Sequence, residues 1–223
     1  MTALRGTLDL SVPEDLFDVM VPEDPEEARA VFRDLFSRMF PRAGAHDLGV
    51  LTDGLLAWRR RLRDSGVVLH GIVALPASET GATPAHWHFF AGVVDVPEAG
   101  ELDAGVVAAR YLGDQLEPDR AYTEAYETDM GWGVGVITEV PLQPGDLPPD
   151  LRAAAGAGEP TALPPVLGLA AAIAAAPDSR HGLLVVGLCL DVERTLEMAA
   201  VVASVAGTSV VHVEESGAVD GTP

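Results

Sequence analysis

Apolar residues recur at helical spacing in two segments of the N-terminal third. In residues 25–40 they stand three and four positions apart, with Asp24 placed to cap the helix and Pro41 placed to end it. A second helix is predicted to begin after Asp47 and to end before Gly66, because glycine favours the left-handed conformation just past a helix. Two amphipathic helices therefore precede the first long β segment.

Alternating and continuous apolar runs predict most of the strands. Residues 67–75 and 85–96 are expected to form an antiparallel pair, since only a short polar loop joins them. Residues 121–141 predict two strands that meet around residues 129–131, and residues 182–190 predict one continuously apolar, buried strand.

The two ends of the chain add short elements. Residues 8–12 alternate like a half-exposed strand, and residues 209–213 predict a final strand. Between them Asp191 is expected to cap a helix that runs to about Ala206 and ends at Gly207.

The remaining segments have weaker patterns. Residues 101–115 resemble a helix or a loop, and whether residues 166–176 form a short helix stays open. Residues 147–165 are rich in Pro, Ala and Gly and are interpreted as a connector. We expect one globular domain over residues 1–215, followed by a disordered tail at residues 216–223.

The order of these elements indicates the fold class. Helices alternate with runs of adjacent strands rather than in strict βαβ units. This favours an α+β fold, with an antiparallel β-sheet and helices packed on it, over a doubly wound parallel sheet.

The composition excludes several functions. The 223 residues include 34 Asp or Glu and 14 basic residues, all Arg, so the formal net charge is −20. Without lysine the chain has no Walker-type phosphate-binding lysine, Schiff-base nucleophile or kinase β3 lysine. The negative field disfavours nucleic acids and anionic membranes.

The expected location follows from three further features. The single cysteine, Cys189, excludes an intrachain disulfide and is predicted to be a small core residue. The N-terminal sequence lacks the pattern of a signal peptide, and the longest apolar run is too short to span a bilayer. We therefore expect a soluble, cytoplasmic protein.

Four arginines gather at the end of the second predicted helix: Arg59, Arg60, Arg61 and Arg63. They could form a docking patch for an acidic partner or an anion. Alternatively, they stabilise the negative end of the helix dipole and pair with nearby carboxylates.

Histidines on two neighbouring predicted strands suggest a metal site. His86 and His88 point to one face of a strand, where their imidazoles could converge on an ion. His70 on the preceding strand could be a third ligand, and Glu124 or Asp95 could add a carboxylate. The alternative is that the pair consists of half-exposed strand residues flanking a buried tryptophan.

A glycine repeat and a polar face lie in residues 121–141. Gly131, Gly133 and Gly135 alternate with Trp132 and two valines, which predicts a flat glycine strip on one strand face. A helix of the same chain or a ligand could approach this strip. The preceding strand carries a polar, aromatic face that could line a binding groove, formed by Tyr122, Glu124, Tyr126 and Thr128.

The sequence also resembles a known group of proteins. The acidic entry into the first helix, the run Leu62-Arg63-Asp64-Ser65-Gly66-Val67, and a late strand leading into a closing helix are similar to small actinobacterial proteins of Mog1/PsbP-like architecture. Some of these are encoded beside type VII (WXG100) secretion genes. The resemblance implies an α+β sandwich and an accessory, protein-binding role, and it transfers no functional residue.

Taken together, these features predict a non-catalytic protein, without a cofactor, that binds another protein as an accessory, chaperone or immunity-like factor. One alternative is a metal-binding protein or metal-dependent enzyme using His70, His86 and His88. Another is a small-molecule binder using the glycine strip with Tyr122 and Trp132, together with Tyr126. Whether the protein forms a homo-oligomer stays open.

Overall fold

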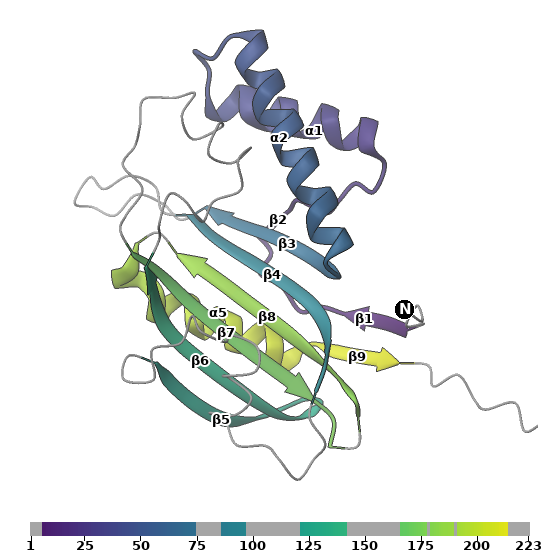
Figure 1. Ribbon diagram of the computed structural model, residues 1–223, viewed down its shortest axis with the longest axis vertical. Coiled ribbons are helices and arrows are strands. Elements are labelled where there is room, and N and C mark those ends of the chain that lie inside the picture. The colour runs from purple at the N-terminus through teal and green to yellow at the C-terminus, as the bar shows by residue number, and fades with distance from the viewer. Residues whose placement is uncertain are drawn as a thin grey trace, which may run out of the picture.

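The computed structural model describes residues 6–74, 86–96, 121–141, 166–177, 179–189 and 191–213 (Figure 1). The predicted segments 101–115, 147–165 and 216–223 lie outside these described residues.

The centre of the described structure is one antiparallel sheet of seven strands in the order β2-β3-β4-β8-β7-β6-β5. A separate two-stranded ribbon pairs the two ends of the described chain. The α+β fold with an antiparallel sheet is therefore confirmed. The strands are β1 (Gly6–Asp9), β2 (Phe17–Asp18), β3 (Val67–Ala74), β4 (His86–Asp95), β5 (Tyr122–Thr128), β6 (Gly131–Pro141), β7 (Val166–Ala175), β8 (His181–Cys189) and β9 (Val210–Val213).

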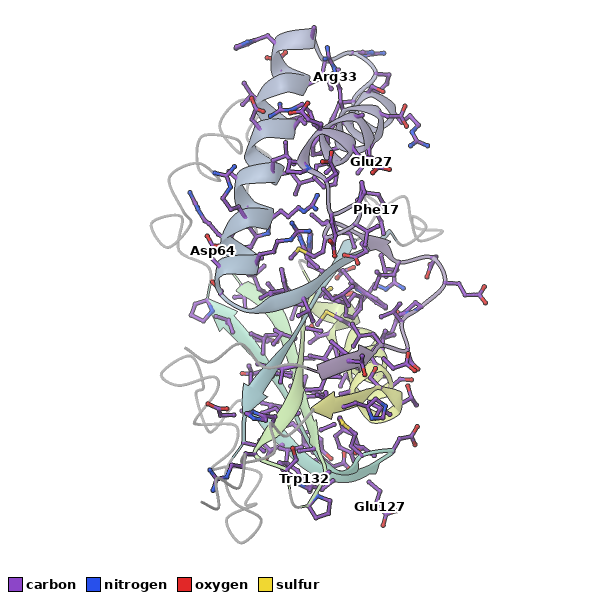
Figure 2. The ribbon with its side chains drawn as sticks, turned by 90° about the vertical axis from the view of Figure 1, so that its right-hand side faces the viewer. Phe17, Glu27, Arg33, Asp64, Glu127 and Trp132 are labelled. Atoms are coloured by element: carbon purple, nitrogen blue, oxygen red, sulfur yellow. The ribbon has the colours of Figure 1, made fainter. Side chains whose placement is uncertain are left out.

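Within the described residues, three α-helices occupy two places around this sheet. The first two, α1 (Pro25–Met39) and α2 (Ala45–Asp64), pack on each other beside the β2–β3 edge. The last, α5 (Thr195–Thr208), crosses one face of the sheet over β7 and β8. Figure 2 shows the helix pair at one end of the molecule, and Trp132 and Glu127 at the other. None of the described helices is long and apolar enough to cross a membrane.

The first helix begins where its sequence predicts. The side chain of Asp24 accepts hydrogen bonds from the backbone N–H groups of Glu26 and Glu27, both at 2.9 Å, so it caps the helix. The second helix begins at Ala45, three residues earlier than expected, because Asp47 accepts from the N–H of the residue before the helix. It ends as predicted, with Gly66 at φ +84°.

The two faces of the sheet are set by strand alternation. The α5 face carries Trp87, Phe89 and Ala91 of β4, and the opposite face carries His88 and Phe90. On the α5 face a Cβ at Gly187 would lie only 2.7 Å from Val202 Cγ2, so the absent side chain lets the helix approach the sheet closely. The core therefore lies between α5 and the central strands.

Two segments differ from the sequence predictions. The run for which a helix stayed open forms the strand β7, which has hydrogen-bonded strands on both sides. Asp191 does not cap a helix, because its side chain makes no capping hydrogen bond and a 3₁₀ turn, η3 (Val192–Arg194), separates it from α5.

Candidate functional site

Two adjoining hollows flank α5 on the side of β5 and β6. Their volumes are about 340 Å³ and about 510 Å³, and they share Tyr122, Ile137 and Leu196 in their walls. We call them together the α5 groove. Its defining residues are Tyr122, Glu124, Tyr126, Gly135, Ile137, Glu139, Glu193, Leu196, Ala199, Ala200 and Ala203.

Small side chains create the hollow under the helix. Gly135 of β6, Ala170 and Ala172 of β7, and Ala199 and Ala203 of α5 line it, and none of them can fill the space between helix and sheet. Two large side chains stand open at the groove, since Leu196 is 71% exposed and Tyr122 is 59% exposed. Exposed large apolar groups around a hollow are typical of a binding surface.

The rim of the groove is acidic. Exposed carboxylates of Glu124, Glu139 and Glu193 stand along it, and no described residue lining either hollow is basic. The hydroxyl of Tyr122 donates a hydrogen bond to Glu124 Oε2 at 3.1 Å, and this bond raises the pKa of Tyr122. The groove therefore combines an apolar floor with a negative border.

Tyr126 occupies the glycine strip. A Cβ at Gly133 would lie 2.6 Å from Thr128 Cγ2 and 3.0 Å from the Tyr126 ring, and a Cβ at Gly135 would lie 3.5 Å from that ring. A side chain of the neighbouring strand thus covers the strip. A helix was expected to approach the glycine strip closely, but the Tyr126 ring covers the strip instead. The Tyr126 hydroxyl is buried without a hydrogen-bond partner, and burial raises the pKa of Tyr126 to about 12.

Trp132 does not belong to this groove. Alternation along β6 puts it on the opposite face, where it packs against a cluster that includes Val134 and Ile173. The small-molecule hypothesis that joined Trp132 to Tyr122 and Tyr126 therefore loses one of its three aromatic residues.

The part of the groove that α5 supplies was not predicted from the sequence. No prediction covered Leu196, Glu193 or the alanines of α5, although the apolar character of this helix is visible in the sequence. Helix α5 is apolar on nearly every side, and a helix of this kind is usually buried on all sides. Only one side of α5 packs on the sheet.

The arginine cluster divides into two pairs. Arg59 is 3% exposed, and its Nη2 donates to the carbonyl oxygens of Pro22 and, at 2.9 Å, Glu23. Arg63 Nη2 donates to the carbonyl oxygen of Met20 at 3.0 Å. Both side chains fasten the segment between β2 and α1 onto α2, so their geometry favours a structural role.

A hollow of about 290 Å³ beside this cluster is lined by arginines together with the carboxylate of Asp53. Arg29, Arg59, Arg60 and Arg63 line it, but Arg29 forms an ion pair with Asp53 in the same wall. Burial lowers the pKa of Arg59, while the carboxylates of Asp18, Glu23 and Asp24 act in the opposite direction. The docking hypothesis is left with the exposed side chains of Arg60 and Arg61.

Two of the three predicted histidine ligands meet on the face opposite α5. His70 Nε2 lies 3.3 Å from His88 Nδ1, and the His70 ring stacks on Phe90 with centroids 4.5 Å apart. His70 is 3% exposed, and its Nδ1 is buried without a partner. Burial first, and then the neighbouring His88, lower the pKa of His70 to about 3, so this imidazole is neutral at physiological pH.

The other proposed ligands are placed differently. The backbone of His86 lies two residues before that of His88 in β4, paired with Ala74, and its side chain is outside the described structure. Four strands lie between β3, which carries His70, and β5, which carries Glu124: β4, β8, β7 and β6. Glu124 therefore lies about 24 Å from His70. The expectation that Glu124 joins the histidines is wrong.

The second carboxylate expected near the histidines is also remote from them. Asp95 stands at the far end of β4, where its Oδ1 lies 3.1 Å from Nδ1 of His181. Among the described residues no three His, Cys, Asp or Glu side chains gather in a way that could hold a metal ion.

Cys189 is a core residue, as the sequence predicts. It is 1% exposed, and its thiol donates to the carbonyl oxygen of Asp191 at 2.9 Å. Burial is the main cause that raises its pKa, which disfavours a nucleophilic thiolate.

Comparison with known proteins leaves function to be argued from this geometry. No protein family and no curated protein matches the chain. Among solved structures the chain is similar to LpqN of Mycobacterium tuberculosis, a protein involved in cell envelope biogenesis. The match covers 94% of this chain and 86% of that chain, with 8% sequence identity and a TM-score of 0.39.

Proposed function

We propose that this protein is a non-catalytic, cytoplasmic accessory factor that binds an extended segment of a basic partner protein along the α5 groove. The observation that carries the proposal is the combination of an apolar floor, an acidic rim and an adjacent edge strand. Chaperone, secretion-accessory and immunity-like roles all need such a surface for a partner.

The edge strand supports an extended partner. Within the described chain β5 is the last strand of the sheet, so its outer edge presents backbone N–H and C=O groups to an added strand. Such β-augmentation draws affinity from the backbone and specificity from pockets for alternate side chains. Every second side chain of an added strand would face the α5 side and could reach toward Leu196.

The charge distribution supports a basic partner. Three carboxylates border the groove, and β5 adds an exposed Glu127. A second copy of this chain would bring another formal charge of −20 to the same edge, which disfavours self-association there. A segment that alternates apolar residues with Lys or Arg complements both the floor and the rim.

Peptide selection with two matched variants tests the proposal. A library of short peptides displayed on phage is selected on the immobilised wild-type protein, and enriched peptides are titrated by fluorescence anisotropy. We expect peptides that alternate apolar and basic residues. Leu196→Glu should weaken their binding about tenfold or more, equivalent to about 1.4 kcal/mol per factor of ten. Val50→Glu, another exposed apolar helix position, should leave binding unchanged.

The rim is tested separately by charge reversal. Glu124→Arg combined with Glu139→Arg should weaken basic peptides and remove most of the salt dependence of their binding. Reversal of Glu14 in the N-terminal loop is the control. Selection of no peptide, or equal binding by the Leu196→Glu and Val50→Glu variants, would overturn the proposal.

A further inference from the structure

The hollow between α1 and α2 is a second feature, independent of the α5 groove. The two helices pack beside the β2–β3 edge of the sheet, whereas the groove lies at β5 and β6 (Figure 1). We propose that this hollow binds a phosphate group, either as inorganic phosphate or as part of a small phosphomonoester. We call it the arginine hollow and define it by Arg29 of α1 and by Asp53, Leu56, Arg59, Arg60 and Arg63 of α2.

Guanidinium groups dominate the walls of the arginine hollow. Four of the 14 arginines of the chain line it, and among the described lining residues Asp53 supplies the single carboxylate. The walls therefore carry a formal surplus of three positive charges. The net charge of −20 does not exclude an anion here, because salt at physiological strength screens charges that lie more than about 8 Å away.

One guanidinium nitrogen of these walls lacks a partner. Arg59 is 3% exposed, its Nη2 donates to two backbone carbonyl oxygens, and its Nη1 is buried without a hydrogen-bond partner. The partners of Nη2 are neutral, so this buried charge makes no direct ion pair with a described carboxylate. An unsatisfied donor on a buried charge is costly, and an anionic oxygen is the acceptor that satisfies it best.

The charge of Arg59 is also incompletely compensated by its surroundings. Burial, and then the neighbouring positive charge of Arg63, lower the pKa of Arg59. The carboxylates of Asp18, Glu23 and Asp24 act in the opposite direction but do not outweigh these two causes. A phosphate dianion between the two guanidinium groups would offset their repulsion and stabilise the charged form of Arg59.

Arg60 and Arg29 add accessible donors. Arg60 is exposed and makes no hydrogen bond or ion pair with a described residue. Arg29 forms an ion pair with Asp53, which holds its guanidinium group between α1 and α2. The planar fork of an arginine can bind two phosphate oxygens at once, and in a chain without lysine every strong phosphate contact from a cationic side chain must come from arginine.

The dimensions of the arginine hollow indicate a small ligand. Its volume of about 290 Å³ lies at the lower end of the about 300–1,000 Å³ found for small-molecule pockets. A phosphate group carries a charge of about −1.5 to −2 at neutral pH, so it matches the positive surplus better than a single carboxylate does. Leu56 adds an apolar side chain to the wall, which suits the organic part of a phosphomonoester.

Isothermal titration calorimetry of the full chain, in chloride buffer free of phosphate and sulfate, tests the site. Inorganic phosphate and phenyl phosphate are titrated separately, and we expect one equivalent to bind. Tighter binding of phenyl phosphate assigns the site to a phosphomonoester, whereas equal binding assigns it to inorganic phosphate.

Two arginine variants locate the binding. Arg60→Gln should weaken the binding of both probes about tenfold or more, because it removes hydrogen bonds from a charged donor. Arg60 is exposed, so circular dichroism should show that this variant keeps its fold. Arg42→Gln removes the same charge from an exposed position between α1 and α2 and should bind like the wild type.

Two aspartate variants test the sign of the effect. Asp53→Asn removes the carboxylate that repels the anion and competes for Arg29, so phosphate should bind about threefold more tightly or better. Asp34→Asn breaks an exposed ion pair with Arg38, which does not line the hollow, and should leave affinity unchanged.

The proposal is overturned if neither probe binds with one-to-one stoichiometry. Equal affinities of the Arg60→Gln and Arg42→Gln variants overturn it as well, because the anion would then respond only to the overall charge. Equal affinities of the Asp53→Asn and Asp34→Asn variants, or weaker binding by Asp53→Asn, also contradict it.

Discussion

Substitution of Arg59 separates a structural role of the arginine cluster from a docking role. Arg59 and Arg60 are neighbours in the same turn of α2, but Arg59 is buried and holds two backbone carbonyl groups, whereas Arg60 is exposed. We expect Arg59→Ala to destabilise the fold and Arg60→Ala to leave stability nearly unchanged. The intrinsic change in helix propensity is the same in both variants, so it cancels in the comparison.

The expected magnitude follows from the contacts of Arg59. A hydrogen bond from a charged donor contributes about 1.5–3 kcal/mol, so the bonds to Pro22 and Glu23 together contribute about 3–6 kcal/mol. Truncation also removes the buried, unpartnered Nη1, which costs the folded state about 1–3 kcal/mol. The difference of these two ranges spans about 0–5 kcal/mol, and its midpoint gives an expected loss of about 2–3 kcal/mol.

Urea denaturation and thermal melting measure this loss. For a chain of this size about 2–3 kcal/mol corresponds to a drop in Tm of about 4–12 °C. Arg59→Lys should recover only part of the stability, because an ammonium group cannot reproduce the geometry of the guanidinium fork. Equal stability of the Arg59→Ala and Arg60→Ala variants, within about 0.5 kcal/mol, would refute the structural assignment.

Three further predictions test packing and burial. Gly187→Ala should destabilise the protein by about 1–3 kcal/mol in urea denaturation, because its Cβ would lie 2.7 Å from a methyl group of α5. Gly49→Ala is the matched control: a Cβ there would meet no atom within 4 Å, so the substitution should stabilise α2 by about 0.5–1 kcal/mol. Burial raises the folded pKa of Tyr126 to about 12 while an unfolded tyrosine ionises near about 10, so stability should be constant below about pH 10 and fall as the pH rises toward about 12. Denaturation of Tyr126→Phe across this range should show a smaller fall, and an identical pH profile would contradict the burial argument. Cys189 should resist iodoacetamide in the native protein and react after unfolding, which mass spectrometry detects.

Local sequence patterns predicted those features that local physics decides. Asp24 caps α1 because a carboxylate before Pro25 can reach the first free N–H groups, and no distant residue takes part. Alternation likewise separated the glycine strip from Trp132, since the side-chain period of a strand is two. The burial of Cys189 followed from its apolar neighbours.

Features that depend on long-range contacts were harder to predict. The alanine-rich run of β7 has high helix propensity, and only pairing with β6 on one side and β8 on the other makes it a strand. The sequence left open that Glu124 could add a carboxylate to the histidines. The sheet instead inserts β8, β7 and β6 between them, and no local pattern reveals this order.

The arginine cluster lies between these two cases. Arg59 and Arg63 are four residues apart and share one helix face, whereas Arg60 and Arg61 point elsewhere. Helical spacing alone could therefore have divided the cluster. Which face is turned inward depends on the segment between β2 and α1, whose carbonyl groups the guanidinium groups of Arg59 and Arg63 hold.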